Sequence, residues 1–391
     1  MSKKVRLGIL GIGNMGSSHA TKLVAGECPE IELTAVCDVK PERLEWAKEN
    51  LGEGVARFAT AEEMMDSGVI DALVVAVPHY DHPKYSIMAM KRGLHVLTEK
   101  PAGVYTKQVL EMNAVADECN VVFALMMNQR TNCIYRKMRE IMQSGELGEI
   151  RRTNWLMTNW YRSQAYYDSG DWRATWSGEG GGVLMNQCPH NLDLWQWICG
   201  LPVKVFTKMH FGKWHDIEVE DDVTTYVEYE NGATGVFITT TGDDPGTNRF
   251  EIICEKGKLV AGIDSLSMWK AEESESEFSK KNTAPFGKRV FEYTESVETD
   301  GYNPKHIGVL NAFAAAILRG EPLVADGREG IRAVTLSNAM HLSAWTGKEI
   351  DLRNFDHELY YEELMKRVAT SRRKTTVANT VAADMNSTFG S

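Results

Sequence analysis

A glycine-rich turn that directly follows a short apolar segment constrains the fold of this chain more than any other feature. The apolar segment is Val5–Leu10, and a helical pattern begins near Met15. The turn between them reads Gly11-Ile12-Gly13-Asn14-Met15-Gly16. Gly11 permits a tight turn, Gly13 lets a pyrophosphate approach the backbone, and Gly16 allows close helix–strand packing. We therefore predict a dinucleotide-binding Rossmann unit at the start of the chain.

The first third of the chain alternates short apolar segments with amphipathic ones. Strands separated by helices of this length require right-handed crossovers and form a parallel sheet. We predict an α/β Rossmann domain over residues 1–125. Its predicted strands are Val5–Leu10, Ile31–Asp38, Ala72–Val77, His95–Thr98 and Val121–Leu125, and its predicted helices span 15–25, 41–50, 61–67, 83–92 and 107–119.

The pattern changes after residue 126, where segments of alternating polarity replace the continuous apolar ones. Residues 126–391 are predicted to form an α+β domain with a large, mostly antiparallel sheet, used for substrate binding and oligomerisation. The Glu-, Ser- and Lys-rich stretch 271–288 is interpreted as a solvated loop or insertion. Predicted helices span 134–144, 183–198, 304–319 and 329–345, and predicted strands span 148–160, 203–209, 223–229, 234–240, 249–254 and 258–261.

Composition narrows the classes of function. A formal net charge of −11 argues against a nucleic-acid binder, which needs a basic face. The seven cysteines are scattered without a Cys-x-x-Cys pair, so we expect reduced thiols and no metal site. No apolar run approaches the ~18 residues that span a bilayer, and the N-terminal apolar run is interpreted as a strand, not a signal peptide. We expect a cytoplasmic protein without a membrane segment.

An acidic residue at the end of the second predicted strand bears on the choice of cofactor. Asp38 follows Gly16 at about the spacing at which an acid binds the ribose 2′-hydroxyl of NAD. Its carboxylate would repel the 2′-phosphate of NADP, although Lys40 would partly offset this, so NAD is favoured over NADP. The carboxyl ends of the later strands should also face the cofactor. The predicted cofactor-binding residues are Gly11, Gly13, Asn14, Met15, Gly16, Asp38, Pro78, His79, Glu99 and Lys100.

Several short motifs occur in the order found in one family. They are residues 11–16, Glu99-Lys100-Pro101, the segment 128–148 ending in Gly-Glu-Leu-Gly, Gly180-Gly181-Gly182, and His190 followed by Asp193. Together they make the chain resemble the Gfo/Idh/MocA oxidoreductases over nearly its whole length. The resemblance implies that Lys100 is catalytic, that the Lys100–Pro101 peptide bond is cis, and that the protein forms a homodimer or homotetramer through its C-terminal sheet.

A second constellation lies in the predicted helix 183–198. Asn186, His190 and Asp193 stand at i, i+4 and i+7, on one face of that helix. His190 could accept the substrate hydroxyl proton, since imidazole titrates near neutral pH. Many family members carry Asp where this chain has Asn186, and an amide cannot accept a proton. The acid–base work therefore falls to Lys100 and His190, while Asn186 orients the substrate.

Aromatic residues gather just ahead of this constellation. Six of the ten tryptophans lie within residues 155–197, and sugar rings stack their apolar faces on aromatic side chains while their hydroxyls need polar partners. The segment Trp172-Arg173-Ala174-Thr175-Trp176 resembles the branch that acts on nucleotide sugars and glycosides at the sugar C3 hydroxyl. The predicted substrate-binding residues are Arg162, Trp172, Arg173, Trp176, Asn186 and Asp193.

Three hypotheses follow from these features. The leading one is an NAD-dependent dehydrogenase that oxidises a secondary hydroxyl, at C3, of a sugar, glycoside or nucleotide sugar. The second is NAD-dependent glycoside cleavage through a transient 3-keto sugar. The third is a non-catalytic nucleotide-binding regulator. Net NADH formation, cleavage without net NADH, and cofactor binding with neither outcome would distinguish the three.

Overall fold

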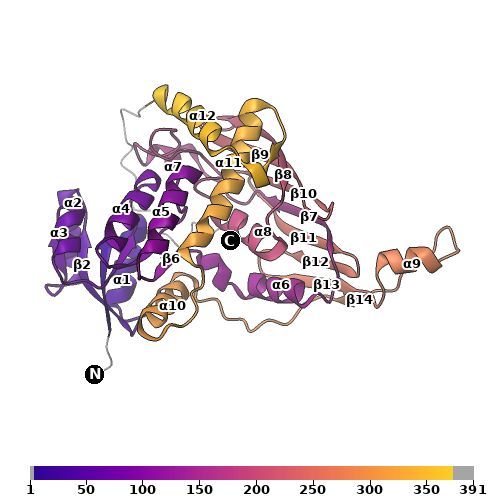
Figure 1. Ribbon diagram of the computed structural model, residues 1–391, viewed down its shortest axis with the longest axis horizontal. Helices are drawn as coiled ribbons and strands as arrows, with labels where there is room; N and C mark the ends of the chain where they lie inside the picture. The colour runs from indigo at the N-terminus through magenta and orange to yellow at the C-terminus, as the bar shows by residue number, and fades with distance from the viewer. Residues whose placement is uncertain (1–3, 373–391) are drawn as a thin grey trace.

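A computed structural model describes residues 4–372, which form two sheets with helices packed around them (Figure 1). The first sheet has six parallel strands in the order β3-β2-β1-β4-β5-β6. The strand order reverses between β1 and β4, and in open parallel sheets the ligand crevice lies at this point. The strands are β1 Val5–Leu10, β2 Ile31–Cys37, β3 Ala56–Phe58, β4 Ala72–Val75, β5 His95–Thr98 and β6 Phe123–Leu125.

Helices cover both faces of this parallel sheet. One apolar cluster joins the sheet to α1 and α2, and a second joins it to α3, α4 and α5. Strands buried on both faces explain why their sequences are continuously apolar. The predicted parallel sheet and its helices are confirmed, with the short strand β3 added. The helices are α1 Asn14–Val24, α2 Pro41–Leu51, α3 Ala61–Asp66, α4 His82–Met90 and α5 Thr106–Glu118, with a 3₁₀ turn η1 at His79–Asp81.

The second sheet has nine strands in the order β14-β13-β12-β11-β7-β10-β9-β8-β15. Every neighbouring pair is antiparallel except β7 and β10, so the predicted mostly antiparallel sheet is confirmed. The strands are β7 Ile150–Met157, β8 Lys204–Phe211, β9 Glu220–Glu228, β10 Thr234–Thr240, β11 Asn248–Cys254, β12 Gly257–Ala261, β13 Leu266–Lys270, β14 Glu292–Thr294 and β15 Ile350–Asp351.

Stacked aromatic rings pack within this sheet and between the sheet and helix α8. Trp155 of β7 stacks on Phe250 at a centroid distance of 4.2 Å, and Trp195 stacks on Phe237 at 5.4 Å. Two 3₁₀ turns, η2 Asn128–Thr131 and η3 Gly327–Glu329, lie beside the first domain, and η4 spans Leu352–Asn354. The helices are α6 Cys133–Ser144, α7 Gln164–Asp168, α8 Pro189–Cys199, α9 Glu275–Lys281, α10 Lys305–Arg319, α11 Gly330–Thr346 and α12 His357–Ala369.

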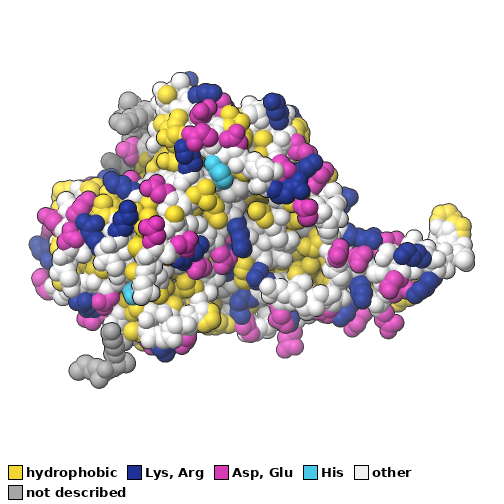
Figure 2. Space-filling model, viewed as in Figure 1, with side chains coloured by type: hydrophobic (Ala, Val, Ile, Leu, Met, Phe, Trp, Pro, Cys, Tyr) yellow, Lys and Arg dark blue, Asp and Glu magenta, His cyan; other side chains and the backbone are white. Residues whose placement is uncertain are grey.

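Two details of the second domain differ from the sequence prediction. The stretch 271–288 is not a plain loop, because it contains α9, which begins at a capping box made by Ser274 and Glu277. This helix projects from the edge of the sheet, and apolar side chains lie at the tip of the loop beyond it (Figures 1 and 2). Phe286 and Val290, in the segment between α9 and β14, are 94% and 88% exposed. Second, α10 packs on the Rossmann sheet, although the sequence placed it in the second domain.

None of the helices within residues 4–372 is both long enough and apolar enough to cross a membrane.

Candidate active site

The glycine turn has the geometry that a bound dinucleotide requires. Gly11 has φ +91, and a Cβ on Gly16 would lie 1.8 Å from the carbonyl oxygen of Gly11, so a side chain at Gly16 would clash with the turn. A Cβ on Gly13 would meet nothing within 4 Å, which leaves space above the turn. Helix α1 begins there with no acid in its first turn and no side-chain cap on its N–H groups. These free donors and the helix dipole fit a pyrophosphate.

Asp38 lies at the end of β2, where the prediction placed it. Its carboxylate accepts hydrogen bonds from the backbone N–H of Ile12 at 2.7 Å and of Lys40 at 2.9 Å. The first bond ties the acid to the glycine turn and fixes its orientation beside the cofactor crevice. A carboxylate oxygen has a second lone pair, so Asp38 can still accept a hydrogen bond from a ribose hydroxyl.

Glu99 and Lys100 follow β5 at the carboxyl edge of the sheet. The peptide bond between Lys100 and Pro101 is cis, as the family resemblance implied. Glu99 is 5% exposed, and its carboxylate lies 2.7 Å from Nε2 of His19, which stands three residues after Gly16. Burial alone would raise the pKa of Glu99. The hydrogen bond and charge of His19 and the charges of His306 and Lys100 lower it instead, to about 2.

Lys100 connects the two domains. Its Nζ donates a hydrogen bond of 2.8 Å to the backbone carbonyl of Asn186, a residue of the second domain. Burial lowers the pKa of Lys100, the carboxylates of Glu99 and Glu179 oppose this, and the guanidinium groups of Arg173 and Arg162 add to it. The net pKa is below the ordinary value, so a neutral amine that can accept a proton is more accessible here than in water.

His190 is the second residue of α8 and is buried. Burial and then the charges of Lys100 and His306 hold its pKa well below the ordinary value, against the opposing charge of Glu99. Its Nδ1 is buried and has no hydrogen-bond partner among the residues that the structure describes. A buried imidazole nitrogen without a partner costs free energy, and a substrate hydroxyl could satisfy it.

Asn186 does not share a helix face with His190, which corrects the predicted helix 183–198. The helix begins only at Pro189, and residues 180–188 form consecutive turns. Among their backbone N–H groups, those of Gly182 and Leu184 donate to the carboxylate of Glu220 at 2.9 and 3.0 Å, while those of Met185 and Asn186 donate to the carbonyl of Gly182. The three glycines that open this segment favour such irregular turns, and Pro189 suits the first position of the helix.

The hydroxyl of Tyr166 accepts hydrogen bonds from several polar side chains near Asn186. Oη of Tyr166 accepts a hydrogen bond from Arg173 at 2.9 Å and from the amides of Asn186 and Gln187, both at 3.2 Å. The guanidinium of Arg173 lies over the rings of Tyr166 and Trp172, each at 4.6 Å from the centroid. Arg162 lies over the Tyr166 ring at 5.2 Å. The predicted residues Arg162, Trp172, Arg173 and Asn186 are therefore brought together.

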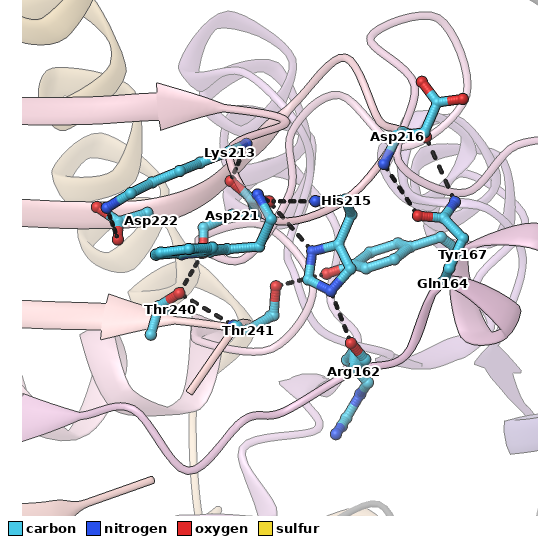
Figure 3. Close-up of polar contacts among 12 residues, drawn as sticks. Arg162, Gln164, Tyr167, Lys213, His215, Asp216, Asp221, Asp222, Thr240 and Thr241 are labelled. Atoms are coloured by element: carbon cyan, nitrogen blue, oxygen red, sulfur yellow. Dashed lines mark hydrogen bonds and ion pairs between the residues drawn. The ribbon is translucent and has the colours of Figure 1, made fainter. Parts of the chain in front are cut away.

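A buried aspartate–histidine pair fixes the segment that carries Arg162 and Tyr166 (Figure 3). Nδ1 of His215 lies 3.1 Å from Asp221, and Nε2 of His215 lies 2.8 Å from the backbone carbonyl of Arg162. Asp221 also accepts backbone N–H bonds from residues 213, 214 and 215. Tyr167 adds a bond of 2.7 Å to the hydroxyl of Thr241. These contacts hold the loop against β9 and β10, which limits the movement of Arg162.

Two predicted substrate-binding residues lie elsewhere. Asp193 forms a two-pronged ion pair with Arg130, with both bonds at 2.7 Å and both side chains 2% exposed. Its carboxylate is therefore engaged inside the protein, which corrects the prediction. Trp176 is 6% exposed and packs against Phe211, His341 and Trp345. It belongs to the hydrophobic core, because its ring faces these aromatic side chains on several sides.

The remaining predicted cofactor-binding residues follow β1 and β4 at the carboxyl edge of the Rossmann sheet. Asn14 is exposed and Met15 half-buried at the start of α1, and Pro78 is exposed after β4. His79 is buried, and its Nδ1 lies 3.3 Å from the backbone carbonyl of Glu179, while its ring lies 5.7 Å from that of Trp172. His79 therefore contacts the second domain. Within residues 4–372, no group of three or more His, Cys, Asp and Glu side chains could hold a metal ion.

The sequence prediction missed two residues of this site, His19 and Glu179. Each carried a signal. His19 extends the glycine motif by one helical turn, which places it on the same face as Gly16. Glu179 directly precedes the glycine triplet and is the only Asp, Glu, Lys or Arg between Arg173 and Asp193.

Family models match both domains. The model described as an oxidoreductase family with an NAD-binding Rossmann fold matches residues 5–127. The model described as the GFO/IDH/MocA C-terminal domain matches residues 135–260. The two matches cover the glycine turn, Lys100, Asn186 and His190.

Individual proteins are also similar to this chain in sequence. The rhizopine catabolism protein MocA of Rhizobium meliloti is 28% identical over 198 residues, which are 50% of this chain and 58% of that protein. The chain thus spans less than two thirds of that relative. D-glucoside 3-dehydrogenase of Escherichia coli is 26% identical over 249 residues, which are 59% of this chain and 68% of that protein.

A solved structure extends the similarity to the whole fold. The WlbA dehydrogenase from Bordetella pertussis, in complex with NADH and UDP-GlcNAcA, has a TM-score of 0.75 and 26% identity, covering 89% of this chain and 99% of that one. The strand order of the two sheets, the glycine turn at residues 11–16 and the two family matches all indicate the same family. The chain therefore belongs to the Gfo/Idh/MocA family of oxidoreductases, with an NAD-binding Rossmann domain followed by the family's C-terminal domain.

Proposed function

We propose that this chain is an NAD-dependent dehydrogenase that oxidises a secondary hydroxyl, at C3, of a sugar, glycoside or nucleotide sugar. One observation carries the proposal. Lys100, at the carboxyl edge of the Rossmann sheet, reaches across to the backbone of Asn186 at 2.8 Å. The amine is thereby placed between the cofactor crevice and the second domain, where a substrate must lie to react with a nicotinamide ring.

The residues around Lys100 divide the remaining work. NAD, when bound, accepts a hydride from the substrate carbon. Lys100 and His190 manage the hydroxyl proton: Lys100, whose pKa is lowered by burial, receives it as a neutral amine, and His190, which burial keeps neutral, hydrogen-bonds the substrate oxygen. Asn186 orients the substrate through hydrogen bonds. Arg162, Trp172 and Arg173 supply charge and an aromatic face suited to a sugar ring.

Two relatives support the substrate class. The Escherichia coli protein is named for action on the C3 position of a D-glucoside. The WlbA dehydrogenase was crystallised with NADH and a nucleotide sugar. We extend both properties to this chain as part of the proposal, together with the preference for NAD over NADP that Asp38 favours. Assembly as a homodimer or homotetramer is likewise proposed.

The test is the appearance of reduced nicotinamide when the purified protein is mixed with NAD and a panel of free sugars, glycosides and nucleotide sugars. The Lys100→Ala and His190→Ala variants should lose about 10²–10⁴-fold of the rate. Lys107→Ala is a matched control, because Lys107 lies at the surface, paired with Glu358, and should leave the rate unchanged.

The possible results separate the hypotheses. Reduced nicotinamide formed with one sugar class, and lost in both site variants, supports the dehydrogenase. Cleaved glycoside without net reduced nicotinamide would replace it with the cleavage reaction. Binding of NAD, measured by calorimetry, without either product across the panel would favour a nucleotide-binding regulator.

A further inference from the structure

The site contains a buried carboxylate next to position 186, where the sequence has an amide. Asn186 cannot act as an acid, yet Glu179 lies beside it and is only 2% exposed. One oxygen of Glu179 contacts the side-chain amide of Asn186, and the other accepts a hydrogen bond of 2.6 Å from the backbone N–H of Ala174. A carboxylate this deeply buried is costly unless other groups need it.

Asn186 links this carboxylate to the lysine. Its side-chain amide faces Glu179, while its backbone carbonyl accepts the hydrogen bond of 2.8 Å from Nζ of Lys100. Glu179 and Lys100 thus lie on two sides of one residue. They are also close enough for the charge of Glu179 to favour the ammonium form of Lys100.

Other charged and titratable groups face Glu179. Burial raises the pKa of Glu179, while Arg173, the Ala174 N–H and the Asn186 amide lower it and Glu220 raises it, with a net rise. Tyr166 and Lys100 also interact with the carboxylate. His79 lies 3.3 Å from its backbone carbonyl. Of the cationic groups near Glu179, Lys100 is the one that gains and loses a proton in the proposed reaction.

We propose that Glu179 supplies the carboxylate that position 186 lacks. Glu179 is a positioning residue: it holds the side-chain amide of Asn186, and its charge stabilises the ammonium form of Lys100. The inference rests on the proposed dehydrogenase. In that reaction the O–H bond of the substrate breaks and its proton moves to neutral Nζ of Lys100, the C–H bond of the same carbon breaks with its electron pair as a hydride that NAD would accept, and the O–H bonding pair forms the C=O bond of the ketone. The charge of ionised Glu179 favours the ammonium group that forms on Lys100.

The test measures the charge state of Lys100 without requiring turnover. The protein is labelled briefly with acetic anhydride across a pH range, and the fraction of modified Lys100 is read by peptide mass spectrometry. Glu179→Gln keeps the size of the side chain and removes the charge. We expect the titration midpoint of Lys100 to fall by about one pH unit or more in this variant. The acid limb of kcat/KM for sugar oxidation should move by the same amount.

A second variant tests whether the charge itself matters. Glu179→Gln combined with Asn186→Asp returns a carboxylate to the neighbouring position, and the Lys100 midpoint should return to within a few tenths of a pH unit of the wild-type value. This comparison with wild type holds even if the single variant does not fold. Glu218→Gln is the matched control, because Glu218 binds a backbone N–H of the same segment, that of Trp176 at 2.6 Å, and should leave the midpoint unchanged.

Each outcome decides the proposal. A Lys100 midpoint that does not move in Glu179→Gln, even with lower thermal stability, assigns Glu179 a purely structural role and overturns it. A midpoint that stays low in the double variant overturns it as well. If no sugar is oxidised but the midpoint moves and returns as expected, the proposed dehydrogenase fails while the pairing of Glu179 with Lys100 stands.

Discussion

The charge of Lys100 is set by opposing forces that act on one nitrogen atom. Burial removes water from the ammonium group and lowers its pKa, and Arg173 and Arg162 act in the same direction, while Glu99 and Glu179 stabilise the charge. His190 beside it is held neutral by burial. A neutral amine accepts a proton, so substrate oxidation requires the deprotonated form of Lys100.

This balance predicts the pH dependence of the reaction. The kcat/KM for oxidation should rise with pH as Lys100 deprotonates, with a midpoint below the ordinary lysine value of 10.5. His190 should add no limb near 6.5, because its pKa is held well below that value. Initial rates across the pH range, with a substrate found in the panel, would check this. A midpoint at 10.5 would show that the amine acts as an exposed lysine would.

A second prediction concerns Asp38. Asp38→Asn retains an oxygen that can accept the N–H of Ile12, a bond now 2.7 Å long, and removes the negative charge. The repulsion between this side chain and the 2′-phosphate of NADP should vanish, so the ratio of kcat/KM for NAD to that for NADP should fall about tenfold or more. Steady-state kinetics with both cofactors measure this ratio. An unchanged ratio would mean that another residue sets the preference.

The sequence predicted residues whose role follows from a local motif. The glycine turn, Asp38 and Lys100 lie where expected, because each is defined by its distance from a strand end. Glu179 was not predicted, since its role depends on the fold bringing Asn186 and Lys100 together from segments 86 positions apart. Asp193 was predicted to bind substrate from its position on the helix alone. Its partner Arg130 comes from another element, and helix periodicity cannot show such a contact.

Elements were predicted best where the apolar pattern was long and uninterrupted. The parallel strands buried on both faces were all identified except β3, whose three residues are only half-buried. The helix predicted over 183–198 begins six residues later, because residues 183–187 form turns and Pro189 takes the first position of α8, where a proline is favoured. Helix α9 was missed since none of its residues is buried, which leaves no apolar periodicity to detect.

The segment between α7 and α8 depends on one hydroxyl group. Tyr166→Phe removes the acceptor shared by Arg173, Asn186 and Gln187. Leaving such donors unpaired costs about 1–3 kcal/mol. Because Arg173 and Asn186 are among the proposed substrate-orienting groups, we expect KM to rise about tenfold. Kinetics with the sugar identified in the panel would measure the change.

A control variant tests whether the rise in KM is specific to the hydroxyl of Tyr166. Tyr293→Phe removes the hydroxyl of an exposed tyrosine on β14, an edge strand of the nine-stranded sheet, and should leave KM unchanged. An equal KM for Tyr166→Phe and the wild type would remove the tyrosine hydroxyl from substrate orientation.

At the scale of the whole molecule, the two domains are joined by more than the site. Helix α10 follows the second sheet in sequence but packs on the Rossmann sheet. An ion cluster reinforces the connection. Arg130 of η2 binds Asp193 of α8 and also Glu329 of η3, the latter at 3.0 Å, and the segment that leads into η3 bridges the Rossmann strand β6 through Ala124 and Asp326. The site lies between the domains, so a fixed domain arrangement keeps Lys100 within reach of Asn186.

The last prediction tests this ion cluster. Asp193→Asn leaves the buried guanidinium of Arg130 without its main counter-charge, and breaking such a pair costs about 3–5 kcal/mol of unfolding free energy. Asp300→Asn removes the partner of Arg136 in an exposed pair and should cost about 1 kcal/mol or less. Urea unfolding of both variants measures the difference. Because the carboxylate of Asp193 is buried and paired with Arg130, KM at temperatures where the variant is folded should stay near the wild-type value. A raised KM with unchanged stability would instead return Asp193 to the substrate site that the sequence assigned to it.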